Sequence, residues 1–147
     1  MQTHLPRKQK GAAAIEFALV FIIFFAVFYG LVSYSLPLLL MQSFNAATAE
    51  AVRQSVALDP NTANYNTVII TRAKAVLTQQ LGALPSSVNF NVNTDASATY
   101  TTGKLLTVRI DYPKAKLAQI IPLLSLPGIG TVPNLPATLS AQASLQF

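Results

Sequence analysis

A long apolar segment near the N-terminus dominates the pattern of hydrophobic and polar positions along the chain. From Phe17 to Ala49 there are 33 residues without a formal charge, and residues 17–31 (FALVFIIFFAVFYGL) are apolar apart from Tyr29 and Gly30. A helix that crosses a bilayer needs about 20 mostly apolar residues. Residues 17–36 supply 20 such positions, so the pattern predicts one membrane crossing here.

The same helix is predicted to continue beyond the apolar run. Pro37 cannot donate a hydrogen bond to the helix ladder, so we expect a kink at this residue with continuation after it. Residues 41–58 keep a helical stripe of mostly small side chains, at Phe44, Thr48, Ala51, Ser55 and Leu58. The sequence Asp59-Pro60-Asn61 then predicts the end of the helix.

A shorter amphipathic helix is predicted next. Asn64 or Asn66 can cap its start, and Gly82 and Pro85 predict its end. Its apolar positions recur at helical spacing, at Ile69, Ala73, Val76, Leu77 and Leu81.

Three later segments alternate apolar and polar residues with period two, which is typical of strands with one wet face. They are residues 88–92, where apolar side chains alternate with asparagines, residues 105–112 and the last nine residues, 139–147. The predicted fold class is therefore α+β, with a long N-terminal transmembrane helix, a second shorter helix and a small antiparallel sheet of about three strands.

The segment between the second and third predicted strands admits two interpretations. Residues 113–136 contain five prolines, which exclude a regular strand or a long helix. Residues 117–126 (LAQIIPLLSL) are apolar but too short for a second crossing. The segment is either a loop that covers the apolar face of the sheet or a contact surface for a partner subunit, and the contact residues would then be Leu117, Ile120, Ile121 and Leu124.

Composition and charge narrow the classes of function. The chain is 52% hydrophobic and only 10% charged, which argues against an ordinary soluble enzyme. Three of its ten basic residues, Arg7, Lys8 and Lys10, lie just before the apolar run. A basic head in this position orients a crossing with the head in the cytoplasm. We therefore expect neither nucleic acid nor a small-molecule substrate as a partner.

The residue types that most enzyme sites require are scarce. The chain has no cysteine, and its one histidine, His4, lies in the basic head. Thiolate sites are thereby excluded, as is a histidine-based triad or metal cluster in the folded part. Arg109 and Asp111 are expected to form a solvated pair on a strand face. We expect no catalysis, no cofactor and no metal.

Glu16 stands out because it lies at the start of the apolar helix. A charged side chain at the centre of a membrane crossing costs about 2.5–3.5 kcal/mol, less near the interface, and such residues usually mark a function or a partner. The alternative is a carboxylate that gains about 0.3–1 kcal/mol from the dipole at a helix N-terminus. The residues before Glu16 favour a function, because a basic head ends at Gly11 and three alanines follow.

The string RKQKGAAAIEF, followed by the apolar run, resembles the leader and processing site of the type IV pilin superfamily. In that family a membrane-embedded prepilin peptidase cuts after the glycine, and a glutamate is the fifth residue of the mature chain. Gly11 would then end the leader, Ala12 would begin the mature chain and Glu16 would be its fifth residue. Phe17 after the acid resembles the TadE-like minor pilins, or pseudopilins, of tight-adherence (Flp, type IVc) pili. Alanine instead of a bulky residue after the cut is a departure that this group tolerates.

The resemblance implies an organisation and a role. Residues 1–11 would be a cleaved leader, residues 12–58 the N-terminal helix with its crossing at 17–36, and residues 59–147 an extracytoplasmic α+β domain. Glu16 would neutralise the ammonium of Ala12, in its own or a neighbouring subunit, when the helix moves from the bilayer of the bacterial inner membrane into a fibre. The implied partners are other pilins and minor pilins, the prepilin peptidase and the assembly platform of a pilus that attaches cells to surfaces. Helical spacing predicts a packing face at Leu19, Ile22, Ile23, Ala26 and Tyr29.

Two other interpretations of the N-terminus stay open. Ala47-Thr48-Ala49 has the small-x-small form of a secretory cleavage site, which would release a product that begins at Glu50. An uncleaved single crossing with a periplasmic scaffold or sensor domain is the other alternative. It explains the apolar run but not the string around Gly11.

Overall fold

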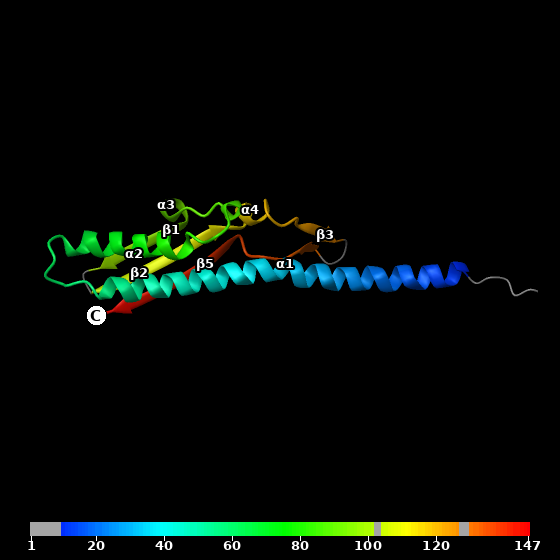
Figure 1. The fold of residues 1–147 in the computed structure, drawn as a ribbon, viewed down its shortest axis with the longest axis horizontal. Coiled ribbons are helices and arrows are strands. Elements are labelled where there is room, and N and C mark those ends of the chain that lie inside the picture. The colour runs from blue at the N-terminus through cyan, green and yellow to red at the C-terminus, as the bar shows by residue number, and fades with distance from the viewer. Residues whose placement is uncertain (1–9, 102–103, 127–129) are drawn as a thin grey trace, which may run out of the picture.

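One helix forms the long axis of the molecule. The computed structural model describes residues 10–101, 104–126 and 130–147. Helix α1 (Lys10–Val56) has 47 residues, which corresponds to a length of about 70 Å. Its first turns project beyond the rest of the molecule, and the other elements lie along the remainder of the helix (Figure 1). Pro37 lies inside α1, and the predicted continuation of the helix past this residue is confirmed.

The remaining elements form a small α+β domain beside the C-terminal half of α1 (Figure 1). Strands β1, β2 and β5 form an antiparallel sheet in the order β1-β2-β5, and β3 and β4 form a separate antiparallel hairpin. The predicted fold class, α+β with a three-stranded antiparallel sheet, is confirmed. In chain order the elements are α2 (Tyr65–Leu81), the 3-10 turn η1 (Ser86–Val88), α3 (Val92–Asp95), β1 (Ala96–Thr101), β2 (Leu105–Pro113), α4 (Lys114–Leu117), β3 (Leu124–Leu126), β4 (Gly130–Val132) and β5 (Thr138–Gln146).

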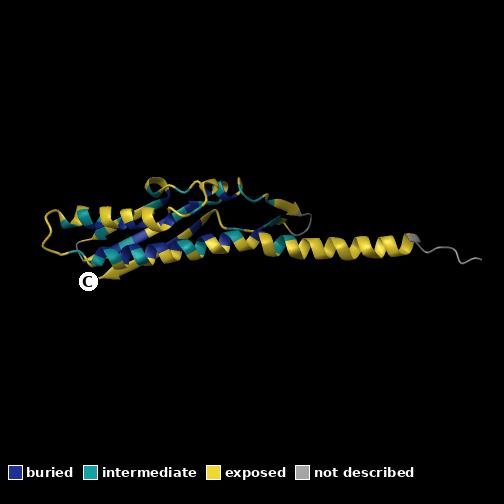
Figure 2. Ribbon diagram, viewed as in Figure 1, coloured by how far each residue is buried: buried dark blue, intermediate teal, exposed yellow. Residues whose placement is uncertain are grey.

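The core lies between the two long helices and one face of the sheet. Both α1 and α2 pack against the sheet and against each other. Four side chains of α1 in the predicted stripe are buried, and so are the five predicted apolar positions of α2. The central strand β2 alternates as predicted and buries Leu106, Val108, Ile110 and Tyr112. Figure 2 shows that the buried residues are confined to the domain and to the half of α1 beside it.

The start of α2 differs in detail from the prediction. Asn64 occupies the capping position, but its backbone is left-handed and its side chain makes no capping hydrogen bond. Its carbonyl oxygen instead accepts hydrogen bonds from the backbone N–H groups of Thr67 and Val68.

The predicted strand at residues 88–92 is wrong. The chain forms η1, then the left-handed residue Asn89 with φ of 50°, and then the single helical turn α3. The asparagine side chain at position 91 accepts a hydrogen bond from the backbone N–H of Asn93 and caps this turn. Val88 is nevertheless buried and Phe90 packs against the core. The alternation therefore reflected burial, and the first strand of the sheet is β1.

The segment of residues 113–136 contains more regular structure than its prolines predict. It holds the turn α4 and the hairpin β3–β4, whose strands have three residues each. Its first part covers the core, because Leu117 is wholly buried and Ile120 and Ile121 pack against the core residues. Its second part, the hairpin, extends along α1 away from the sheet (Figure 1).

Candidate functional site

The residues around the predicted cleavage point lie at the exposed tip of α1. Arg7 and Lys8 lie outside the described residues, and Lys10 is the first residue of the helix. Gly11 and Ala12 follow in its first turn and are exposed. A Cβ atom built on Gly11 would have no neighbour within 4 Å, so the described structure leaves this position open on its side-chain side.

Glu16 is exposed on the first turns of α1, and among the described residues no hydrogen-bond donor or cation contacts its carboxylate. Phe17 beside it is 71% exposed, and its ring stacks on Phe21 with centroids 6.1 Å apart. Within the described part of the chain, the acid therefore has no partner at the head of an apolar helix.

The N-terminal half of α1 presents apolar side chains around its circumference. Leu19, Ile22 and Ile23 are each more than half exposed, and Ala26 is exposed as well. Aromatic residues four apart stack along the helix from Phe21 through Phe25 to Tyr29. Within the described part of the chain, α1 is the one helix that is long and apolar enough to cross a membrane. So much exposed apolar surface needs a bilayer or other helices to cover it.

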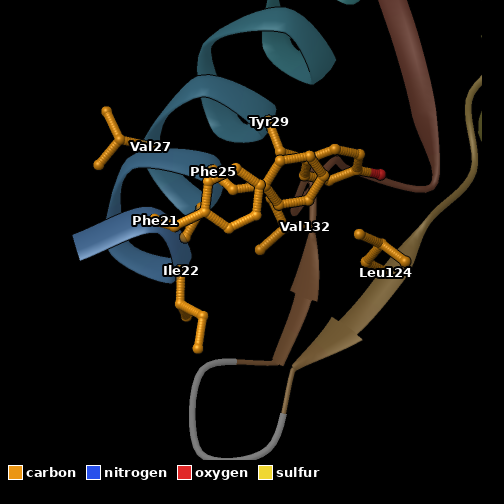
Figure 3. Close-up of a pocket in the computed structure, with 8 residues that line it drawn as sticks. Phe21, Ile22, Phe25, Val27, Tyr29, Leu124 and Val132 are labelled. Carbon is orange, nitrogen blue, oxygen red and sulfur yellow. The ribbon is translucent and has the colours of Figure 1, made fainter. Parts of the chain in front are cut away.

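The hairpin β3–β4 lies beside this apolar half of α1, and the residues that flank the hairpin bind to the helix. Leu124 and Val132 face the helix across a groove of about 420 Å³, which Phe21, Phe25 and Tyr29 line on the other side (Figure 3). The Tyr29 hydroxyl donates a hydrogen bond to the carbonyl oxygen of Pro122, just before the hairpin. Just after it, the backbone N–H of Asn134 donates to the Tyr34 hydroxyl at 2.8 Å.

The four residues named for a partner surface are separated by the fold. Leu117 is wholly buried in the core and is therefore not part of any surface. Ile120 and Ile121 are half-buried against the core. Leu124 is 39% exposed and lies on the hairpin beside α1. The first part of the segment thus covers the core as one alternative predicted, whereas a partner surface at Leu124 stays a prediction.

Inside the domain, the structure reveals an ion pair that the sequence did not indicate. The Lys116 Nζ atom lies 2.6 and 2.8 Å from the two carboxylate oxygens of Asp95, which is only 4% exposed. The same amine donates to the carbonyl oxygen of Asn89 at 3.0 Å. The Tyr112 hydroxyl donates to the carbonyl oxygen of Val88 at 2.7 Å, and burial of the ring raises the pKa of this tyrosine. These contacts hold the irregular segment 86–95 against β2 and α4.

The wet face of the sheet carries the predicted pair of Arg109 and Asp111. Their side chains are 48% and 40% exposed and lie 2.7 Å apart, so the prediction of a solvated pair is confirmed. Hydrogen bonds from Arg109 and then from Ser140 hold the pKa of Asp111 below its usual value. Both groups have ordinary structural partners, and nothing in their geometry indicates catalysis.

Metal-binding chemistry has no support in the described ranges, where no three acidic, histidine or cysteine side chains come together. The features that remain for a function are the acid Glu16, the open Gly11–Ala12 position and the uncovered half of α1.

One comparison with known proteins matches this part of the chain. Residues 11–53 match a family model described as TadE-like protein, and they cover all but the ends of α1. No curated protein and no solved structure matches the chain. Helix α1 of this chain is therefore similar to the N-terminal region of TadE-like proteins.

Proposed function

We propose that the protein is a minor pilin or pseudopilin that is cut by a prepilin peptidase between Gly11 and Ala12 and takes part in assembling a tight-adherence pilus for surface attachment. TadE-like proteins belong to tight-adherence pilus systems, and the processing and the assembly role are the proposed steps. One observation carries the proposal. Glu16, the fifth residue after the glycine, stands without a described partner at the head of a helix whose first half is almost bare.

Cleavage would supply the missing partner of this acid. It removes the basic head and creates an ammonium at Ala12, four residues before Glu16 on the same helix. Residues four apart share one helix face, with about 6 Å between them along the axis. Two opposite charges 4 Å apart attract by about 4 kcal/mol at an effective dielectric constant of 20, before desolvation is subtracted. A pair between the Ala12 ammonium and the Glu16 carboxylate, within one chain or between neighbouring subunits, would lower the cost of burying the start of the helix in a fibre.

The exposed apolar N-terminal half of α1 suits both environments that the proposal requires, the membrane and the fibre. In the inner membrane its apolar circumference faces lipid, and the basic head keeps the N-terminus on the cytoplasmic side with the domain in the periplasm. In a fibre the same surface packs against the helices of other pilins. Other pilins, the peptidase and the assembly platform are therefore the proposed partners.

The N-terminus of the protein isolated from membranes of its native host tests the proposal. Terminal sequencing and intact mass should give a chain that starts at Ala12. A start at Glu50 would indicate a secreted product. An intact Met1 in a host with an active prepilin peptidase would instead leave an uncleaved membrane-anchored scaffold. Either of these two results contradicts the proposal.

Gly11→Ala separates recognition by the peptidase from helix stability. Loss of the glycine should block processing, so that the protein keeps its full-length mass. Gly30→Ala is the matched control, because Gly30 lies in the same helix and a Cβ there also has no neighbour within 4 Å. Normal processing is expected for the control, and normal processing of both variants would contradict the leader assignment.

A further inference from the structure

The hairpin β3–β4 lies beside the part of α1 that is suited to a bilayer, and not beside the part that the domain covers (Figures 1 and 2). Its two strands pair from Leu124 opposite Val132 to Leu126 opposite Gly130. Leu124 and Val132 share the groove with Phe21 and Phe25 (Figure 3). The hairpin therefore lies beside helix positions that are inside the predicted crossing at residues 17–36.

The depth of these positions follows from helix geometry. If residues 17–36 occupy the hydrocarbon, Phe25 lies 11 residues, or about 16 Å, from the end nearest the domain. If the crossing instead occupies the 20 residues 12–31, Phe25 still lies six residues, or about 9 Å, inside that end. In the first placement, the side chains that share the groove with Phe25 would lie near the middle of a hydrocarbon core about 30 Å thick. In the second placement they lie within the leaflet on the domain side.

Two tyrosines hold the hairpin at this level. The Tyr29 hydroxyl donates to the carbonyl oxygen of Pro122, just before the hairpin. The Tyr34 hydroxyl accepts from the backbone N–H of Asn134, just after the hairpin. These helix positions are five residues apart, about 7.5 Å along the axis. Tyrosine is enriched at the interface of membranes because its ring is apolar and its hydroxyl is polar.

The composition of the C-terminal segment permits contact with lipid. The 31 residues from Leu117 to Phe147 include no aspartate, glutamate, lysine, arginine or histidine. No charge near the hairpin would therefore have to be desolvated. The outer edges of a two-stranded ladder still need hydrogen-bond partners, which headgroups and interfacial water provide and hydrocarbon does not. These two constraints favour the second placement, in which the hairpin lies closer to the headgroups, over insertion at the centre of the bilayer.

We propose that the β3–β4 hairpin is an interfacial membrane element, in which Leu124 contacts the acyl chains of the leaflet on the domain side of the bilayer. The ties at Tyr29 and Tyr34 then couple the depth of the hairpin to the depth of α1. The hairpin thereby sets how far the helix extends out of the membrane. This inference requires that α1 crosses the bilayer, and it is independent of processing and of the pilus.

Site-specific fluorescence tests the inference in the full chain, which has no native cysteine. Three single-cysteine variants are labelled with an environment-sensitive dye and reconstituted in vesicles of phosphatidylethanolamine and phosphatidylglycerol. Leu124→Cys reports the hairpin, Ile23→Cys reports the crossing, and Ser97→Cys on the exposed face of β1 is the control in the body of the domain. Leu124 is partly exposed, so its replacement leaves the core unchanged.

Lipids with a nitroxide on the acyl chain should quench the dyes at Leu124 and Ile23 several-fold more than the dye at Ser97. Iodide in the aqueous phase should quench in the reverse order. The inference is overturned if Leu124 behaves like Ser97 while Ile23 is quenched by lipid. It is also overturned if Leu124 loses its protection from iodide when the protein is diluted into excess lipid, because the groove would then hold a second copy of the chain. If lipid does not quench the dye at Ile23, α1 does not cross the bilayer, and the inference about the hairpin is refuted with it.

Discussion

At the scale of single residues, the Asp95–Lys116 pair is the contact on which the irregular part of the domain depends. Asp95 accepts hydrogen bonds from Lys116 and from the backbone N–H of Asn91 at 2.8 Å, and the carboxylate is almost fully buried. Removal of one partner of a buried pair leaves the other charge without compensation. Removing one partner should therefore cost more free energy than the intact pair contributes to folding.

We predict that Asp95→Asn destabilises the domain by about 3 kcal/mol, at the low end of the range for a broken buried pair because Lys116 is 23% exposed. The measurement is urea unfolding of the full chain in detergent micelles, followed by circular dichroism. Asp111→Asn, which removes the same charge from an exposed pair, is the control. Equal losses in the two variants would contradict the assigned difference in burial.

The Arg109–Asp111 pair predicts a pH dependence. Its partners lower the pKa of Asp111 in the folded state, so the charged form stabilises the fold at pH values above the unfolded pKa of about 3.9. This contribution disappears as the pH falls through the folded pKa. Because the pair is exposed, its contribution to the unfolding free energy should be about 0.2–1 kcal/mol at pH 7.

The corresponding experiment compares the unfolding free energy of the wild type with that of Asp111→Asn, from pH 7 down to values below the folded pKa of Asp111. The difference should shrink toward zero in acid and should also fall at high salt, because salt screens exposed charges. If the difference in unfolding free energy instead grows as the pH falls, the charged form of Asp111 does not stabilise the fold.

At the scale of elements, the C-terminal half of α1 packs closely because its buried positions are small. Ala47 and Ala51 are almost fully buried on the face of α1 that packs against the domain, and Ala73 is buried on α2. Ser55 satisfies its buried hydroxyl by donating to the carbonyl oxygen of Ala51 at 2.6 Å. A well-packed core of this kind has no room for additional methylene groups.

Ala51→Leu should therefore destabilise the domain by about 1–3 kcal/mol through overpacking. Ala49→Leu lies two residues away on the exposed side of α1 and should change the unfolding free energy by less than about 0.5 kcal/mol. Thermal unfolding of both variants under the same detergent conditions provides the comparison. Similar melting temperatures for the two variants would argue against tight packing at position 51.

At the scale of the whole molecule, the chain divides into an exposed helix tip, for which we propose a role in assembly, and a domain that shares its core with the C-terminal half of α1. The exposed acid and the bare apolar surface lie on the tip, whereas the buried residues lie in the domain (Figure 2). Changes at the tip should thus affect assembly without affecting the fold of the domain.

Glu16→Ala tests this division in the native host. Processing should persist, because by the resemblance the peptidase recognises chiefly the glycine, but incorporation of the subunit into pili should be lost. Glu50→Ala removes an acid from the same helix outside the proposed crossing, where Glu50 pairs with Arg53, and assembly should continue. Immunoblots of sheared pili and of membranes measure both outcomes. Normal pili in the Glu16→Ala strain would refute the role of the acid.

The features that could be predicted from the order of residues are those that depend on local periodicity. Spacing along one helix identified the five buried positions of α2 and the buried stripe of α1, because each face is formed by residues only three or four apart. Period-two alternation identified the buried face of β2 for the same reason. The acid, the glycine and the basic head are also close together in the sequence, so the string around Gly11 was sufficient to predict the similarity of residues 11–53 to TadE-like proteins.

The remaining features depend on contacts between distant residues, which no local pattern encodes. Alternation at residues 88–92 reported burial correctly but not backbone conformation, since a turn with Asn89 in the left-handed region can bury the same side chains. Asp95 and Lys116 meet only because α3 and α4 pack against the same sheet. The hairpin meets α1 across some hundred residues, through Tyr34 and Asn134. Periodicity along the chain therefore determined which faces are buried, whereas tertiary packing determined the partners of those faces, because pairing over such separations depends on the whole fold.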